Sequence, residues 1–132
     1  MSAHQDFQTP TVRARGLGSA KEGVEHYVRQ RVSALALIVL VPWFLFSVIA
    51  AMDAGYAGAR DWAAQPWNAI LLILTFGAAF FHMRLGMQTV IEDYIAKTGT
   101  RQALLVLNTF AAVGLFAVTA LTVLKIWVSA GV

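Results

Sequence analysis

The chain alternates between three long apolar runs and short polar segments. The apolar runs cover about residues 32–52, 66–95 and 103–128. A helix needs about 20 residues to cross the ~30 Å hydrocarbon core of a bilayer, and each run reaches that length. The pattern therefore predicts an all-α integral membrane protein with three transmembrane helices, in which residues 19–132 form one membrane anchor domain.

The segment before the first run has two parts. Residues 1–18 are a polar tail without an apolar run of signal-peptide length. Ser19 followed by Glu22 is typical of a helix start, and apolar and charged positions then separate onto different faces as far as about Gln30. This predicts a short amphipathic helix at the membrane surface that leads directly into the first span.

Proline and tryptophan positions refine the spans. Pro42 lies inside the first run and should kink that helix, because its ring removes one helical hydrogen bond. Residues 53–65 are rich in Gly and Ala and are expected to be a connection, after which Pro66 begins the second span. Trp62 and Trp67 suit an interfacial aromatic belt.

Composition supports a membrane protein. Of 132 residues, 58% are hydrophobic and only 13% are charged, whereas soluble domains have about 25% charged residues. There is no cysteine, which excludes disulfides, thiolate metal sites and iron–sulfur clusters held by this chain alone. The net charge of +3 comes from basic residues that flank apolar runs, so the expected surroundings are membrane lipids and no nucleic acid.

Basic residues also predict the orientation. Two of them, Arg60 and Lys125, lie on the side of the first connection and the C-terminus. Lys and Arg in excess mark the cytoplasmic side, so the N-terminus and the end of the second span should face the cytoplasm and the C-terminus the periplasm. The seven on the cytoplasmic side are Arg13, Arg15, Lys21, Arg29, Arg31, Lys97 and Arg101.

The second run carries ionisable side chains at membrane depth. Such groups cost roughly 2.5–3.5 kcal/mol to insert and are by default candidates for function. On a helix, His82 lies in a stripe of small residues that ends in Asp93, while Arg84 lies about 200° away. Imidazole is a common ligand of haem iron, although a histidine bonded to a neighbouring helix would fit the same pattern.

Two further candidates lie at the edges of the spans. Arg31 stands at the entrance of the first span, and Tyr94 follows Asp93 at the end of the second. An arginine that extends to the headgroups and a tyrosine of an aromatic belt are the structural alternatives for these two residues.

Together these residues resemble a known family, the hydrophobic membrane-anchor subunit of succinate dehydrogenase (respiratory complex II), of the smaller or D type. The likeness covers almost the whole chain, including the three spans and the cytoplasmic N-terminus. The motifs that carry it are Gly23-x7-Arg31-x-Ser33-Ala34 and His82-x3-Gly86-Met87-x5-Asp93-Tyr94.

The resemblance implies residue roles. His82 would be an axial ligand of the iron of haem b, and Arg31 would lie beside a haem propionate. Tyr94 would hydrogen-bond ubiquinone, with Asp93 close by. A six-coordinate haem needs two axial ligands and His82 is the one histidine within the predicted spans, so the second ligand is expected from another membrane subunit.

The implied function is that of a membrane-anchor subunit of succinate:ubiquinone oxidoreductase in the bacterial inner membrane, in the tricarboxylic acid cycle and aerobic electron transport. The subunit would not be catalytic alone, since succinate oxidation belongs to flavoprotein and iron–sulfur partners, and the other membrane partner would be a cytochrome b subunit. Fumarate reductase is a close relative, and the sequence favours neither direction of electron flow. The alternative is a non-redox small membrane subunit of a transporter or assembly complex, although internal repeats typical of transporters are absent from the sequence.

Overall fold

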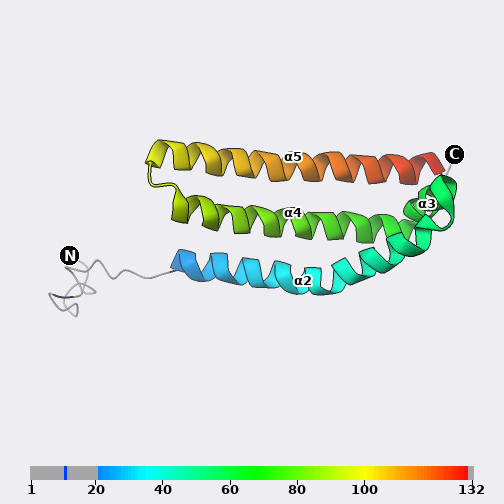
Figure 1. Cartoon of the computed structure of the whole chain (residues 1–132), viewed down its shortest axis with the longest axis horizontal. Coiled ribbons are helices and arrows are strands. Elements are labelled where there is room, and N and C mark those ends of the chain that lie inside the picture. Colours follow the sequence, from blue (N-terminus) through cyan, green and yellow to red (C-terminus); the bar gives the residue numbers. More distant parts are fainter. Residues whose placement is uncertain (1–10, 12–20, 131–132) are drawn as a thin grey trace, which may run out of the picture.

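Three long helices lie side by side, and a short helix closes one end. The computed structural model describes Thr11 and residues 21–130. Figure 1 shows α4 between α2 and α5 and antiparallel to both. The helices of this part of the chain are α2 (Lys21–Met52), α3 (Gly55–Ala64), α4 (Pro66–Tyr94) and α5 (Thr98–Ala130).

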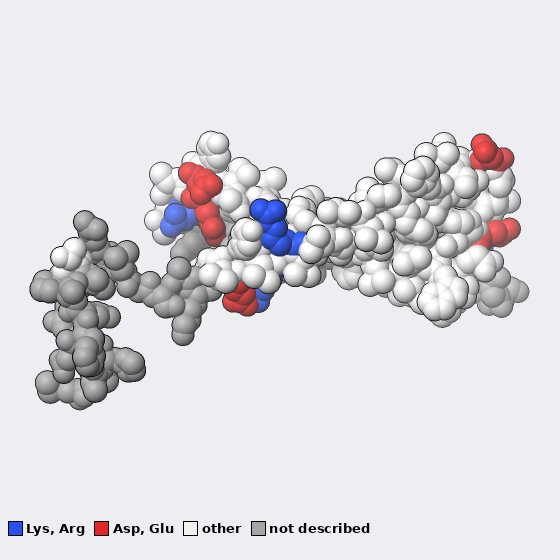
Figure 2. Space-filling view, turned by 90° about the horizontal axis from the view of Figure 1, so that it is seen from below, with Lys and Arg blue, Asp and Glu red and all other residues white. Residues whose placement is uncertain are grey.

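The three predicted spans are confirmed. The helices α2, α4 and α5 are each long and apolar enough to cross a membrane. On the face shown in Figure 2, charged groups gather toward the two ends of the described bundle, and the surface between them is uncharged. Apolar side chains cover most of the outside, which suits contact with lipid because hydrocarbon replaces water around them.

The predicted amphipathic segment leads directly into the first span. The amphipathic segment and the first span form one continuous helix, α2, and Ser19 lies outside the described residues. Pro42 lies within α2 without ending it, and the helix bends in its cyan part in Figure 1. The bend agrees with the predicted kink, since proline weakens the helix at one hydrogen bond only.

The connection expected at residues 53–65 contains a helix, α3. Gly55 begins it with a φ of 65°, a conformation that glycine adopts without strain. The half-buried Trp62 stacks on Trp43 of α2, with ring centroids 6.2 Å apart, whereas Trp67 is exposed, so the predicted aromatic belt stays a prediction for both residues. Arg60 Nη2 donates to Ser129 Oγ at 3.1 Å, so α3 is tied to the last turns of α5.

These contacts define two ends of the bundle. The α3 end holds the buried cluster of Ala69, Leu72 and Val123, which α3 covers with its own aromatic ring. The Tyr94 end is where α2 begins, α4 ends and α5 begins. The candidate residues named from the sequence all lie in the half of the bundle toward the Tyr94 end.

Leu85→Ala is expected to destabilise the fold by about 2 kcal/mol. Leu85 is the largest fully buried side chain among the described residues, at 2% exposed. Leucine-to-alanine changes cost about 2–5 kcal/mol in soluble cores, and the lower value applies because lipid already provides an apolar surrounding for the unpacked helix. Thermal denaturation in mild detergent measures the loss. Leu74→Ala on the same helix, at 54% exposed, is the control, and equal losses in both variants would contradict the prediction.

Candidate functional site

A line of polar contacts joins α2 to α4 near the Tyr94 end. His26 Nε2 lies 3.3 Å from Thr89 Oγ1, and Ser33 Oγ lies 3.0 Å from His82 Nδ1. Between these pairs, a Cβ added at Gly86 would meet the side-chain amide of Gln30 at 3.9 Å. The spacing follows one face of each helix, so the two helices keep a constant register. We call this line the polar seam: His26, Gln30 and Ser33 of α2 with His82, Gly86 and Thr89 of α4.

The hydrogen bonds of Ser33 determine which nitrogen of His82 carries a proton. Ser33 Oγ lies 2.9 Å from the carbonyl oxygen of Gln30, which can only accept. A hydroxyl has one proton to donate, so Ser33 donates it to Gln30 and accepts a hydrogen bond from His82. The His82 imidazole therefore carries its proton on Nδ1, and its Nε2 keeps a lone pair that this contact does not use.

His82 also lines a groove on the outside of α2. Two adjoining cavities of about 330 and 470 Å³ share His82 and Ala34, and each is large enough for part of a ligand. The groove, called the His82 groove, is polar toward the Tyr94 end and apolar toward the bend in α2. Its lining comprises Tyr27, Gln30, Arg31, Ala34, Leu37, Ile38, Val41, Pro42 and His82.

Arg31 lies at the polar part of the His82 groove. Its guanidinium carbon is 5.1 Å from the centroid of the Tyr27 ring, a cation–π contact that holds the side chain over α2. The structure therefore brings Arg31 and His82 together in one groove. A flat ligand with an apolar body and an anionic edge would match this lining, because the body meets aliphatic side chains and the edge meets a cation.

Tyr94 and Asp93 lie apart from that groove, at the last turn of α4. Tyr94 is 82% exposed and Asp93 is exposed as well. Because α4 is an uninterrupted helix, the rise from His82 to Asp93 is roughly 16 Å. Neither side chain forms a hydrogen bond or ion pair within the described part of the chain, so both are open to a ligand or a partner.

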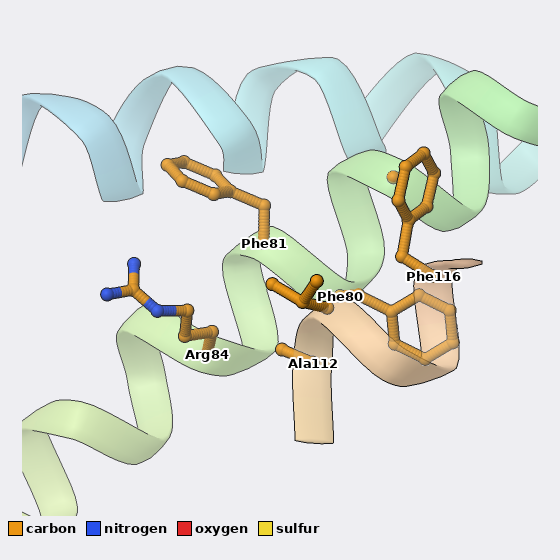
Figure 3. A pocket seen from close by; sticks show the side chains of 7 residues that line it. Phe80, Phe81, Arg84, Ala112 and Phe116 are labelled. Carbon is orange, nitrogen blue, oxygen red and sulfur yellow. The ribbon is translucent and has the colours of Figure 1, made fainter. Parts of the chain in front are cut away.

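Arg84 faces α5, away from the His82 groove, as its helical angle predicts. Its Nε donates to Thr109 Oγ1 at 3.1 Å, and Asn108 Nδ2 donates to the Arg84 carbonyl at 2.9 Å. Figure 3 shows Arg84 beside Phe81 at an apolar cavity of about 190 Å³ between α4 and α5. Arg84 therefore belongs to the contact between these two helices.

Sequence reasoning missed several members of the site. It assigned no role to Gln30 or Thr89, and it quoted Ser33 only as part of a motif. The spacing of His26, Gln30 and Ser33, which share one helical face, was the signal that could have found the seam. His26 does not line the His82 groove, and His4 lies outside the described residues. Within those residues no three His, Cys, Asp or Glu side chains cluster as a metal site. His82 is the one histidine among the residues that line the groove.

Comparisons with known proteins agree on one family. Residues 5–124 match the family described as succinate dehydrogenase/fumarate reductase transmembrane subunit. A succinate dehydrogenase hydrophobic membrane anchor subunit from Rickettsia bellii (strain RML369-C) is 34% identical over 101 residues, which are 76% of this chain and 81% of the relative. The protein of the same name from Paracoccus denitrificans is 33% identical over 102 residues, 77% of this chain and 78% of the relative. No solved structure matches the chain.

Proposed function

Because the chain belongs to the succinate dehydrogenase/fumarate reductase transmembrane subunit family, we propose that it binds haem b together with a second membrane subunit and forms part of a ubiquinone-reduction site. Its place as a succinate dehydrogenase membrane anchor rests on the family match and on the relatives of that name. The cofactor, the quinone site and the particular partners are the proposed part.

The observation that carries the haem proposal is the state of His82. Its Nδ1 lies 3.0 Å from Ser33 Oγ, which we infer to be the acceptor of the ring proton, and its side chain lines a groove of ligand size, which leaves the Nε2 lone pair for a ligand. Histidines that bind metals commonly donate the other ring N–H to a protein acceptor in this manner. When bound, haem would supply a one-electron acceptor within the bilayer, and His82 would supply Nε2 as one axial ligand.

The lining of the groove fits the rest of the group. The aliphatic side chains from Ala34 toward Pro42 exclude water from one flat surface of a ligand. Arg31 stands at the polar part of the groove, where its planar guanidinium can pair with a propionate carboxylate. This chain offers one histidine nitrogen to the groove, so we assign the second axial ligand to a partner, a cytochrome b membrane subunit.

The quinone site is placed at the Tyr94 end. The Tyr94 hydroxyl can donate a hydrogen bond to a quinone carbonyl, whose oxygen gains negative charge as it is reduced. Asp93 would orient a water molecule or a basic group of a partner. The excess of Lys and Arg around this end favours the cytoplasmic side of the inner membrane, where a soluble iron–sulfur subunit and its flavoprotein could deliver electrons.

Purification from native membranes in mild detergent tests the proposal as a whole. We expect a low-spin haem spectrum and co-purification of a second membrane chain, an iron–sulfur subunit and a flavoprotein. A bis-histidine haem spectrum from this polypeptide as an isolated monomer would contradict the shared site. A complex that lacks haem and redox partners would favour the alternative of a non-redox transporter or assembly subunit.

A further inference from the structure

We propose that Ser33 is a positioning residue for the axial ligand, which holds the imidazole of His82 as a neutral Nδ1–H tautomer and directs Nε2 to the His82 groove. The inference rests on the proposed role of His82 as a haem ligand. The inference assigns a role to Ser33 of α2, whose hydroxyl determines the tautomer of His82 and the direction of its Nε2.

The Ser33 acceptor is oriented by a hydrogen bond within its own helix. Ser33 is only 6% exposed, and its hydroxyl proton is directed to the Gln30 carbonyl on the same helix, three residues back. This backbone contact orients the oxygen lone pairs toward α4, where His82 Nδ1 lies 3.0 Å away. The acceptor therefore needs no rearrangement to receive the Nδ1 proton.

The opposite tautomer of His82 is disfavoured by the same contacts. With the ring proton on Nε2, Nδ1 would be a second acceptor facing the Ser33 oxygen at 3.0 Å. Ser33 could bond it only by turning its single proton away from the Gln30 carbonyl, at the loss of that hydrogen bond. One tautomer satisfies both contacts and the other satisfies one, so Ser33 selects the form that leaves Nε2 able to ligate iron.

The chemical type of the acceptor sets the electron-donating strength of the ligand. A carboxylate acceptor would draw the Nδ1 proton strongly and make the imidazole a stronger donor to iron, which stabilises the oxidised metal. A serine hydroxyl is neutral and draws the proton weakly. The nearest carboxylate on this face of α4, Asp93, is roughly 16 Å away along the helix. Ser33 therefore keeps His82 a neutral and moderate donor.

Ser33→Ala and Ser33→Thr in the purified complex test the inference. Alanine removes the acceptor and leaves the Nδ1 proton unbonded, so we expect haem affinity to fall roughly 10–100-fold. The midpoint potential of the remaining haem should rise, because the ligand becomes a weaker donor, and its low-spin electron paramagnetic resonance signal should shift. Threonine keeps the hydroxyl and should restore all three properties.

Two further variants identify the cause of each outcome. Thr89→Val removes the other hydrogen bond of the polar seam without touching His82, and it should leave the potential and the signal unchanged. An equal shift in Thr89→Val and Ser33→Ala would overturn the inference, since general loosening of the seam would explain both. Unchanged haem in His82→Leu would refute the proposed function itself. If His82→Leu loses haem while Ser33→Ala keeps normal haem affinity, midpoint potential and resonance signal, only the proposed role of Ser33 is refuted.

Discussion

Replacing His82 by leucine is expected to reduce haem content by more than tenfold and to abolish the six-coordinate low-spin spectrum of any haem that remains. Loss of a residue that merely supports a metal ligand costs roughly 10–100-fold, so loss of the ligand itself should cost more. The three spans should still insert, because leucine is cheaper to place in hydrocarbon than histidine. The Ser33 hydroxyl keeps its bond to the Gln30 carbonyl, so the change leaves no buried donor unpaired.

His26→Leu is the matched control for this prediction. His26 is half-buried on the same polar seam. Like His82, it contacts a side-chain hydroxyl, that of Thr89, but it does not line the His82 groove. Haem content and the absorption spectrum of the purified complex measure both variants. We expect normal haem in His26→Leu, and normal haem with an unchanged axial spectrum in His82→Leu would eliminate His82 as a ligand.

Tyr94→Phe is expected to lower ubiquinone reduction by about tenfold or more. The substitution keeps the ring and removes one donor, and a hydrogen bond to a group that gains charge contributes roughly 1.5–3 kcal/mol. Haem content, assembly and succinate oxidation by an artificial soluble acceptor should stay near normal, because Tyr94 is largely exposed and its hydroxyl forms no hydrogen bond within the described residues. Steady-state quinone reduction, compared with the artificial acceptor, measures the difference.

Tyr56→Phe separates a quinone donor from a tyrosine of an aromatic belt. Tyr56 is 87% exposed and lies on α3, at the opposite end of the bundle from Tyr94. If both tyrosines served only as belt residues, the two variants would behave alike. Asp93→Asn should resemble Tyr94→Phe with a smaller loss. Unchanged quinone reduction and inhibitor affinity in both Tyr94→Phe and Asp93→Asn would place the quinone pocket elsewhere.

The fold was largely predictable because hydrophobic length alone determines how many helices can span a bilayer. The three spans followed from runs of apolar residues, and Pro42 marked the bend of α2. The helix α3 was missed because it is only 10 residues long and contains two glycines, which weaken a helix that has no other support. Its stability depends on tertiary contacts, the Trp43–Trp62 stack and the Arg60–Ser129 hydrogen bond, which no local pattern encodes.

The candidate residues could be named from the sequence, but their contacts could not, and their chemical roles stay predictions. His82 was visible as a polar residue in an apolar run, and the helical angle of Arg84 correctly placed it away from His82. That Arg84 contacts Thr109 of α5 was not predicted. Which residue of α2 contacts His82 depends on how far α2 is shifted along the bundle axis relative to α4. Hydrophobic patterns do not determine this shift to better than about one helical turn. The contact with Ser33 therefore required the three-dimensional structure.

The polar seam also bears on the order of membrane insertion, helix packing and cofactor binding during biogenesis. Within the described residues, no buried side-chain nitrogen or oxygen lacks a hydrogen-bond partner. With the seam closed, no buried side-chain donor is left without a partner, so the packing of these helices is complete in its own hydrogen bonds. Insertion of the chain and binding of the proposed haem can then be separate events in biogenesis, and the proposed partner subunit could bind before or after the haem.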